Sequence, residues 1–172
     1  WDHINVFPTY ENYVEQFRLF LESIVPGGSV TYNEEDPEVR RLVEALQVPI
    51  RKFPYNTPDY EVRGGTTYLH TPEGPMPLKI FGAHNLSNMA GAKWICQQMG
   101  VDEADFYEAM ASFPGASKRL QPLHTGGQRR IFKDFAHSPS KVRATTAAVR
   151  EQYPEQKLTT CLELHTYSSL NA

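Results

Sequence analysis

The chain has 172 residues, of which 40% are hydrophobic and 22% are charged, a composition typical of a globular domain and not of a fibre or a polar tail. Its 17 Lys and Arg residues are balanced by 20 Asp and Glu residues, so the formal net charge of -3 provides no overall attraction for nucleic acid or an anionic membrane. No stretch approaches the roughly 20 apolar residues that a membrane-spanning helix needs. We therefore expect neither nucleic acid nor a membrane as a partner.

The first part of the chain predicts alternating helices and strands. Apolar side chains recur at helical spacing over residues 10–24, which predicts a helix. A short strand is expected at residues 29–32, and a helix that begins with a proline is expected at residues 37–46. Over residues 50–81 the pattern changes to short runs broken by glycines and prolines, which predicts hairpin strands.

Two further helices are expected at residues 85–99 and 102–111, the first ended by Gly100 in a left-handed conformation. The character of the sequence changes after them. We place a domain boundary there, giving domains of residues 1–112 and 113–172.

The second domain is expected to continue the α/β pattern. It begins with a strand at residues 131–135, followed by a helix that Ser138 caps and Pro139 starts, and a strand at residues 158–164. Such a βαβ unit is nearly always a right-handed parallel crossover. The predicted fold class is α/β throughout.

The two cysteines indicate the compartment. Cys96 lies on an expected buried helix face, and Cys161 lies in an expected buried strand. Buried positions of this kind are typical of reduced thiols, which predicts a cytoplasmic protein.

The segment between the last hairpin strand and the next helix is the first candidate site. His84, Asn85 and Asn88 gather at this helix start, followed by small residues. An Asn amide offers both a donor and an acceptor, as recognition of an adenine edge requires, and small residues let a flat ring approach the backbone. The alternative is that Asn85 or Ser87 only caps the helix.

The second candidate site lies where the strand at residues 131–135 gives way to a helix, the place where open α/β sheets bind ligands. Asp134 could accept hydrogen bonds from ribose hydroxyls or a metal-bound water, and His137 could donate to phosphate. The alternative is a loop in which Asp134 satisfies nearby backbone amides and His137 is solvated.

Two further candidates are basic or metal-binding. Arg119 follows Lys118 and offers a planar fork for phosphate or carboxylate, and Arg129 and Arg130 form a second pair, although surface cations are most often simply solvated. His3 follows Asp2 and could bind a metal, but a metal site needs further ligands that the sequence does not reveal.

In this order and spacing, the segments resemble the Mur ligase family over essentially the whole chain. His84, Asn85 and Asn88 are similar to the family's His-Asn-x-x-Asn motif, which opens the adenine-contacting helix. Residues 113–119 resemble the Phe-x-Gly-x-x-x-Arg motif, whose arginine reaches the nucleotide. Residues 134–139 resemble the Asp-x-x-His-x-Pro motif that opens the C-terminal domain.

The resemblance implies both the architecture and the site. Residues 1–112 would be the C-terminal part of a central ATPase domain, and residues 113–172 the start of a Rossmann-like C-terminal domain. His3 resembles the end of a Glu-x-Asp-His motif and would bind Mg²⁺, whereas Gln121 stands where the family usually has glutamate. Asp134 and His137 would be catalytic. The residues that hold ATP would be His84, Asn85, Asn88, Arg119 and Asp134.

The resemblance also implies a reaction. In such a ligase, ATP phosphorylates the lactyl carboxylate of UDP-N-acetylmuramate, and the amine of an amino acid or peptide attacks the acyl phosphate. Residues 163–171 look most like the peptidoglycan-recycling branch, which adds L-alanyl-γ-D-glutamyl-meso-diaminopimelate. The alternatives are the L-alanine-adding ligase, a folylpolyglutamate or cyanophycin type of ligase, and a nucleotide-binding module without catalysis.

The chain also departs from the family in its phosphate-binding motif. No Gly-rich loop ending in Gly-Lys-Ser or Gly-Lys-Thr occurs among its residues. Because the sequence also begins at Trp1 without a methionine, we expect a fragment that lacks the phosphate-binding loop and the UDP-sugar domain and is inactive alone. We also expect its truncated sheet to expose apolar surface and to favour self-association.

Overall fold

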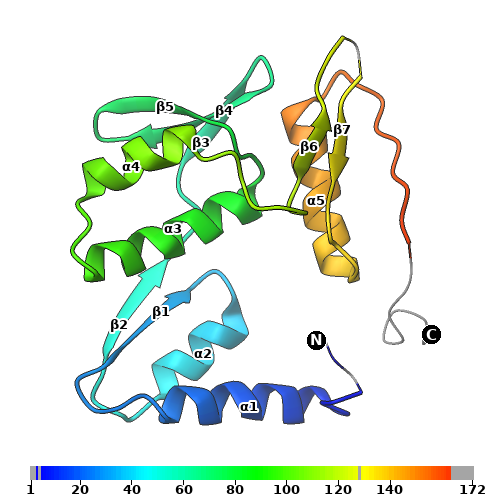
Figure 1. Cartoon of the computed structure of the whole chain (residues 1–172). Helices are drawn as coiled ribbons and strands as arrows, with labels where there is room; N and C mark the ends of the chain where they lie inside the picture. The colour runs from blue at the N-terminus through cyan, green and yellow to red at the C-terminus, as the bar shows by residue number, and fades with distance from the viewer. Residues whose placement is uncertain (1–2, 4, 128, 164–172) are drawn as a thin grey trace.

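The computed structural model describes residue 3, residues 5–127 and residues 129–163, which form a mixed α/β fold (Figure 1). The described elements follow one another as two helix and strand pairs, a three-stranded hairpin sheet, two helices, a hairpin and a last helix. In the part of the chain so described, no helix is long and apolar enough to cross a bilayer.

The N-terminal unit is a pair of parallel strands joined by a helix, and the helices and the strand predicted before residue 47 are confirmed. Asp36 caps the crossover helix by accepting from the backbone N–H groups of Glu38 and Val39 at 2.9 and 3.0 Å. Hairpin strands were predicted from residue 50 onward, and this was wrong for the first strand. Residues 51–55 pair in parallel with residues 29–33. The elements are α1 (Tyr10–Glu22), β1 (Ser29–Asn33), α2 (Pro37–Ala45) and β2 (Arg51–Tyr55).

The hairpin sheet follows, with antiparallel pairing in the order β3-β4-β5. Its first turn contains Gly64 and Gly65, both with positive φ, so the predicted hairpin is confirmed for this part of the chain. The strands are β3 (Tyr60–Arg63), β4 (Thr66–Thr71) and β5 (Gly74–Leu78).

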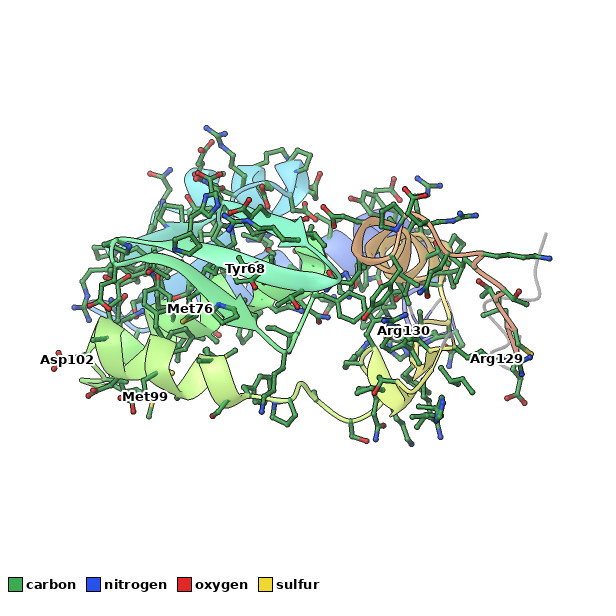
Figure 2. All side chains as sticks on the ribbon, turned by 90° about the horizontal axis from the view of Figure 1, so that it is seen from above. Tyr68, Met76, Met99, Asp102, Arg129 and Arg130 are labelled. Atoms are coloured by element: carbon green, nitrogen blue, oxygen red, sulfur yellow. The ribbon has the colours of Figure 1, made fainter. Side chains whose placement is uncertain are left out.

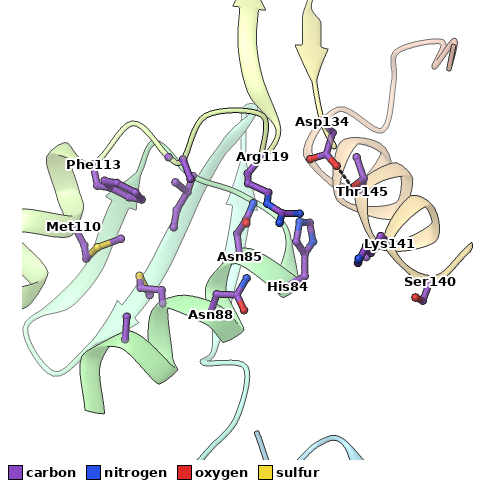
Figure 3. Close-up of a pocket in the computed structure, with 16 residues that line it drawn as sticks. His84, Asn85, Asn88, Met110, Phe113, Arg119, Asp134, Ser140, Lys141 and Thr145 are labelled. Atoms are coloured by element: carbon purple, nitrogen blue, oxygen red, sulfur yellow. Dashed lines mark hydrogen bonds between the residues drawn. The ribbon is translucent and has the colours of Figure 1, made fainter. Parts of the chain in front are cut away.

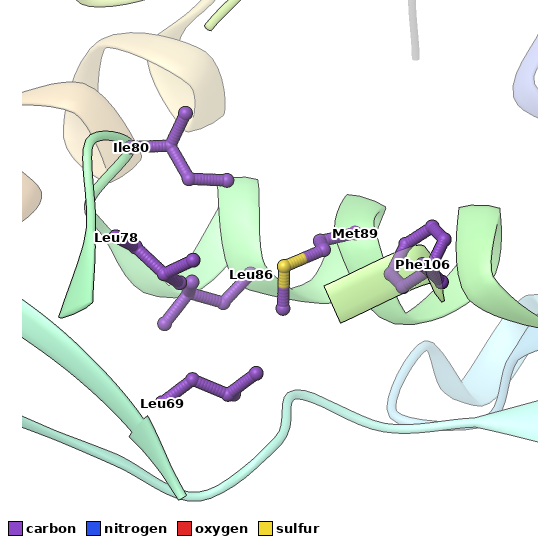
Figure 4. Packing of buried hydrophobic residues seen from close by; sticks show 6 residues of the cluster. All are labelled: Leu69, Leu78, Ile80, Leu86, Met89 and Phe106. Atoms are coloured by element: carbon purple, nitrogen blue, oxygen red, sulfur yellow. The ribbon is translucent and has the colours of Figure 1, made fainter. Parts of the chain in front are cut away.

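Helices α3 (Ala83–Gln98) and α4 (Glu103–Ser112) pack against the hairpin sheet, and α3 also contacts β1 and β2. Gly100, two residues after the end of α3, has φ of 89°, the left-handed conformation that was predicted. The main core lies between these helices and the sheet, and burying side chains of this size contributes roughly 1.5–3 kcal/mol each. Its members, drawn in Figure 4, are Leu69, Leu78, Ile80, Leu86, Met89 and Phe106.

The last third of the chain differs from its prediction. Strands β6 (Gln121–His124) and β7 (Ile131–Lys133) form an antiparallel hairpin, and α5 (Pro139–Gln152) follows it with Ser138 at its N-cap position. The strand expected at residues 158–164 was wrong: residues 158–163 have no regular secondary structure, and Leu164 lies outside the described residues. The expected parallel βαβ unit is therefore not formed by the described residues, and Cys161 is exposed instead of buried.

Helix α5 packs against the earlier part of the chain, so the two predicted domains are in contact (Figure 1). An apolar cluster joins Phe81, Leu120 and Ala148 across this contact. A buried polar bridge reinforces it, because the Thr67 hydroxyl donates to Gln152 Oε1 at 2.8 Å and Gln152 Nε2 donates to the Gly65 carbonyl at 2.7 Å. The boundary near residue 113 stays a prediction.

Candidate functional site

A cavity of about 690 Å³ opens between the start of α3, the segment after α4 and the first turns of α5 (Figure 3). This volume lies within the usual range of small-molecule sites. One side of its wall is mainly apolar and the other is mainly polar or charged. The apolar and small residues are Ile80, Met89, Ala92, Met110, Phe113, Gly115, Ala116 and Ala144; the polar ones are His84, Asn85, Asn88, Arg119, Asp134, Ser140, Lys141 and Thr145.

The first turns of α3 supply an imidazole and two amides to this wall. These belong to His84, Asn85 and Asn88, which the sequence predicted to gather at one helix start. The helix begins two residues earlier than expected, with Gly82 at the N-cap position and no side-chain cap. Asn85 is therefore not the cap: its Nδ2 donates to the Phe81 carbonyl at 2.9 Å, which orients the amide beside the cavity. Asn88 lies about one turn further along, and both amides face the cavity in Figure 3.

His84 is half-buried at the centre of the polar side. Burial lowers the pKa of its imidazole, because a buried ring loses the hydration that stabilises the charged form. The Asp134 carboxylate opposes this by raising the pKa of His84, and the Arg119 guanidinium lowers it further. The imidazole is therefore neutral near pH 7 and can donate from one ring nitrogen and accept at the other.

Asp134 reaches the cavity from the end of β7, but both carboxylate oxygens already have backbone partners. Its Oδ2 accepts from the Leu120 N–H at 2.7 Å, and its Oδ1 accepts from the Ala136 N–H at 2.7 Å. The Thr145 hydroxyl also donates to Oδ1, at 3.3 Å (Figure 3). This geometry corresponds to the alternative in which Asp134 satisfies nearby amides.

Arg119 enters the cavity from the segment between α4 and β6, and Figure 3 shows its side chain extending toward His84. The site therefore draws His84, Asn85, Asn88, Arg119 and Asp134 from three separate segments to one cavity. Together they offer a neutral imidazole, two amides and a guanidinium, a set suited to a heterocycle that carries negative charge.

Comparison with known proteins bears on the family. The profile of the Mur ligase middle domain matches residues 1–96, which is more than half of the chain. The chain belongs to the Mur ligase family. The predicted α/β class and the resemblance to this family are thereby confirmed.

Relatives in this family are similar over the whole chain but are much longer. A UDP-N-acetylmuramate–L-alanine ligase from Roseiflexus sp. is 26% identical over 100% of the chain and 42% of its own length. The enzyme of that name from Mycobacterium tuberculosis is 29% identical over 99% of the chain and 40% of its own length. The chain thus spans about two fifths of the length of these relatives.

Two solved structures share the fold of this chain. MurF from Acinetobacter baumannii matches with a TM-score of 0.69 and 19% identity over 90% of this chain and 35% of that one. Folylpolyglutamate synthetase from Lactobacillus casei matches with a TM-score of 0.60 and 16% identity over 83% of this chain and 40% of that one. At such identities the likeness concerns the fold alone.

Two residues predicted for this Mur ligase site do not line the cavity. His137 Nδ1 lies 2.8 Å from the Phe135 carbonyl, and its Nε2 lies 3.5 Å from Lys141 Nζ. The His3 carbonyl accepts from the N–H groups of Val6 and Phe7 at the other end of the described chain, while Asp2 lies outside the described residues. The roles of His137 in catalysis and of His3 in binding Mg²⁺ stay predictions.

The other basic pair is also away from the cavity. The Arg130 guanidinium lies over the Tyr153 ring at 4.5 Å from its centroid, and Arg129 is exposed farther out in Figure 2. These two arginines are not among the residues that line the cavity.

Several residues of the cavity wall in this Mur ligase chain were not predicted from the sequence. Lys141 and Thr145 lie four residues apart on α5, one turn beyond the predicted motif at its start, so helical spacing from that motif could have indicated them. Met110 is two residues before the end of α4, and no local pattern separates it from an ordinary packing residue.

Proposed function

We propose that this chain forms the adenosine-binding part of an ATP-dependent ligase that joins an amino acid or a peptide to UDP-N-acetylmuramate. The observation that carries the proposal is the convergence of residues 84–88, Arg119 and Asp134 on one cavity, although His84 and Asp134 lie 50 positions apart in the sequence. Family membership supports the reaction class, and the side chains that line the cavity support adenosine as the part of the substrate bound here.

The two sides of the cavity suit the two ends of adenosine. Met110 and Phe113 offer polarisable and aromatic surface for a flat base at the apolar side. Asn85 and Asn88 border this surface and can pair with the donor and acceptor edge of adenine. Arg119 lies beyond them, where its fixed fork favours a phosphate oxygen.

The reaction then requires two transfers. The γ-phosphoryl group of ATP moves to a carboxylate oxygen of the sugar nucleotide, with ADP leaving; the amine then attacks the carbonyl carbon of the acyl phosphate, and inorganic phosphate leaves. The contribution of this chain is to hold and orient the adenosine end, which converts part of the encounter into an intramolecular step. Its sequence has no Gly-Lys-Ser or Gly-Lys-Thr loop, so the cradle for the transferred phosphate is not supplied by these residues.

Mg²⁺ would stabilise the negative charge on the transferring phosphoryl group when bound. Among the residues that the structure describes, no group of three His, Cys, Asp or Glu side chains is placed to hold a metal ion. The expected role of His3 in binding Mg²⁺ stays a prediction.

The identity of the amine is the finer part of the proposal. Residues 163–171 suggested the recycling branch that adds a tripeptide, but the structure describes only Glu163 of this segment, and the rest lies outside the described residues. The relatives at 26 and 29% identity carry the name of the L-alanine ligase, which favours L-alanine as the second candidate amine.

Nucleotide selectivity tests the proposal. We expect ADP to shift the backbone amide resonances of His84, Asn85 and Asn88 in an NMR titration, whereas GDP, with a different base edge, should shift them at much higher concentration. Equal responses to ADP and GDP, or shifts confined to residues outside the cavity, would contradict an adenosine site.

A measurement of ADP release distinguishes a ligase from a module that only binds nucleotide. A polypeptide that contains this chain and a Gly-Lys-Thr loop should release ADP only when both UDP-N-acetylmuramate and an amine are present. ADP binding without such release would favour the non-catalytic module instead. Running L-alanine and the tripeptide in parallel would identify the amine.

A further inference from the structure

The short segment that carries Arg119 has an unusual backbone. Lys118 and Leu120, on either side of Arg119, have φ of 58 and 45°. Residues with a Cβ atom rarely adopt this left-handed region, because the Cβ atom crowds the backbone there. Two such residues in three positions persist only where the surroundings hold them.

The end of β7 holds both of them. The Leu120 N–H donates to Asp134 Oδ2 at 2.7 Å, and the Phe135 N–H donates to the Lys118 carbonyl at 2.9 Å. The Leu120 side chain is 4% exposed and packs with Phe81 of the preceding unit. Backbone hydrogen bonds and burial thus fix residues 118–120 from both sides.

The Asp134 carboxylate is itself fixed, so it can act as an anchor. Its second oxygen accepts from Ala136 N–H at 2.7 Å and from the Thr145 hydroxyl of α5 at 3.3 Å. The carboxylate therefore connects the segment after α4, the end of β7 and the helix that forms one wall of the cavity.

Arg119 has little else to direct it. Its side chain is exposed, and within the described residues no hydrogen bond or ion pair of its guanidinium is formed. It nevertheless lines the cavity and extends toward His84 (Figure 3). The backbone of residues 118–120 sets the direction in which the Arg119 side chain leaves the chain, and so decides whether its guanidinium can reach the cavity.

We propose that Asp134 is a positioning residue that acts through the left-handed segment of residues 118–120 and aims Arg119 into the cavity. This replaces the expected direct contact of Asp134 with the ribose. One part of this proposal rests on the proposed function, namely that Arg119 binds an anionic adenine nucleotide.

The test compares Asp134→Ala, Asp134→Asn and Arg119→Ala, alone and combined, in two measurements. Hydrogen exchange of the Leu120 amide reports the anchor without any nucleotide, and we expect Asp134→Ala to accelerate it at least tenfold. ADP titration reports the aim of Arg119: Asp134→Ala and Arg119→Ala should each weaken ADP binding about tenfold. The double variant should bind no more weakly than Arg119→Ala. Asp134→Asn, which keeps one oxygen acceptor, should fall between the parent and Asp134→Ala in both measurements.

Two outcomes would overturn the proposal. If the losses of ADP affinity multiply in the double variant, Asp134 contacts the nucleotide independently of Arg119. If the Leu120 amide exchanges at the parental rate in a folded Asp134→Ala, the anchor does not exist. If Asp134→Ala does not fold, the same comparison with Asp134→Asn decides. A parent chain that binds no ADP would contradict the proposed function, while Leu120 exchange would still test the anchor.

Discussion

Gly82 joins the hairpin sheet to α3 and lies against α5, so its substitution tests how the two parts of the chain are packed. Its backbone has φ of 87° and ψ of 135°, a region that residues with a side chain almost never occupy. A Cβ atom added at Gly82 would lie 2.4 Å from the Ala148 Cβ atom, far inside van der Waals contact. Gly82→Ala must therefore both strain the backbone and push α5 away.

The two penalties have separate magnitudes. Backbone strain of this kind costs about 1–3 kcal/mol. Overpacking a well-packed contact by one methyl group typically costs about 1–3 kcal/mol more. We therefore expect Gly82→Ala to lower the free energy of unfolding by roughly 2–6 kcal/mol. Because His84 and Asn85 follow directly, the cavity should also loosen.

Urea unfolding of a double-mutant cycle measures this. Ala148→Gly removes the opposing methyl group and alone costs about 1 kcal/mol, as for glycine in a helix interior. In the Gly82→Ala background the same change should also relieve most of the packing penalty, so the two substitutions should show a favourable coupling of about 1–3 kcal/mol. Gly100→Ala is the matched control, because Gly100 has φ of 89° and no neighbouring atom within 4 Å of an added Cβ.

The reasoning would be refuted by two results together. These are an equal loss of stability in Gly82→Ala and Gly100→Ala, and the absence of any recovery in the double variant. Such a pair of results would mean that strain at glycine alone, and not contact with α5, governs this position.

Three further predictions follow from particular contacts. Burial holds the pKa of His84 below its ordinary value of about 6.5, so the unfolded chain binds the proton more readily than the folded chain. The free energy of unfolding should therefore fall as the pH drops below about 7 toward the lower folded pKa. Urea unfolding of His84→Gln between pH 8 and 5.5 should show a flatter pH dependence. Gln152→Leu leaves the Thr67 hydroxyl and the Gly65 carbonyl without their buried partner and should cost about 1–3 kcal/mol of unfolding free energy, whereas Gln156→Leu at an exposed position should cost little; equal melting curves would contradict the bridge. The chain alone should hydrolyse no ATP with Mg²⁺ above a heat-inactivated control, because its sequence lacks the Gly-Lys-Ser/Thr loop; hydrolysis that a cavity variant abolishes would show this to be wrong.

Local sequence signals predicted the elements that depend on local chemistry. Helix α2 was predicted from Pro37 at its first helical position, which the structure shows. Strand β2 was assigned to the hairpin sheet because its own residues do not indicate their partner. Its parallel pairing with β1 depends on the crossover through α2, which is a non-local property.

The candidate site shows the same division. Motif spacing indicated His84, Asn85, Asn88, Arg119 and Asp134, which the structure brings to one cavity. It could not indicate the apolar wall, since that depends on how α4 is rotated against its neighbours. Nor could it show that the amide partner of Asp134 lies 14 residues earlier, because no local pattern encodes that bond.

The adenosine site itself is tested most directly by ADP titration of Asn88→Ala against a matched control. Asn88 is exposed on α3 at the cavity wall, and Asn12 is exposed on α1, outside the residues that line the cavity. Loss of one neutral hydrogen bond to the base is worth about 1 kcal/mol, so Asn88→Ala should raise the Kd for ADP about fivefold. Asn12→Ala should leave the Kd unchanged. Equal Kd values for Asn88→Ala and the parent chain, with both proteins folded, would contradict the account of this cavity as an adenine site.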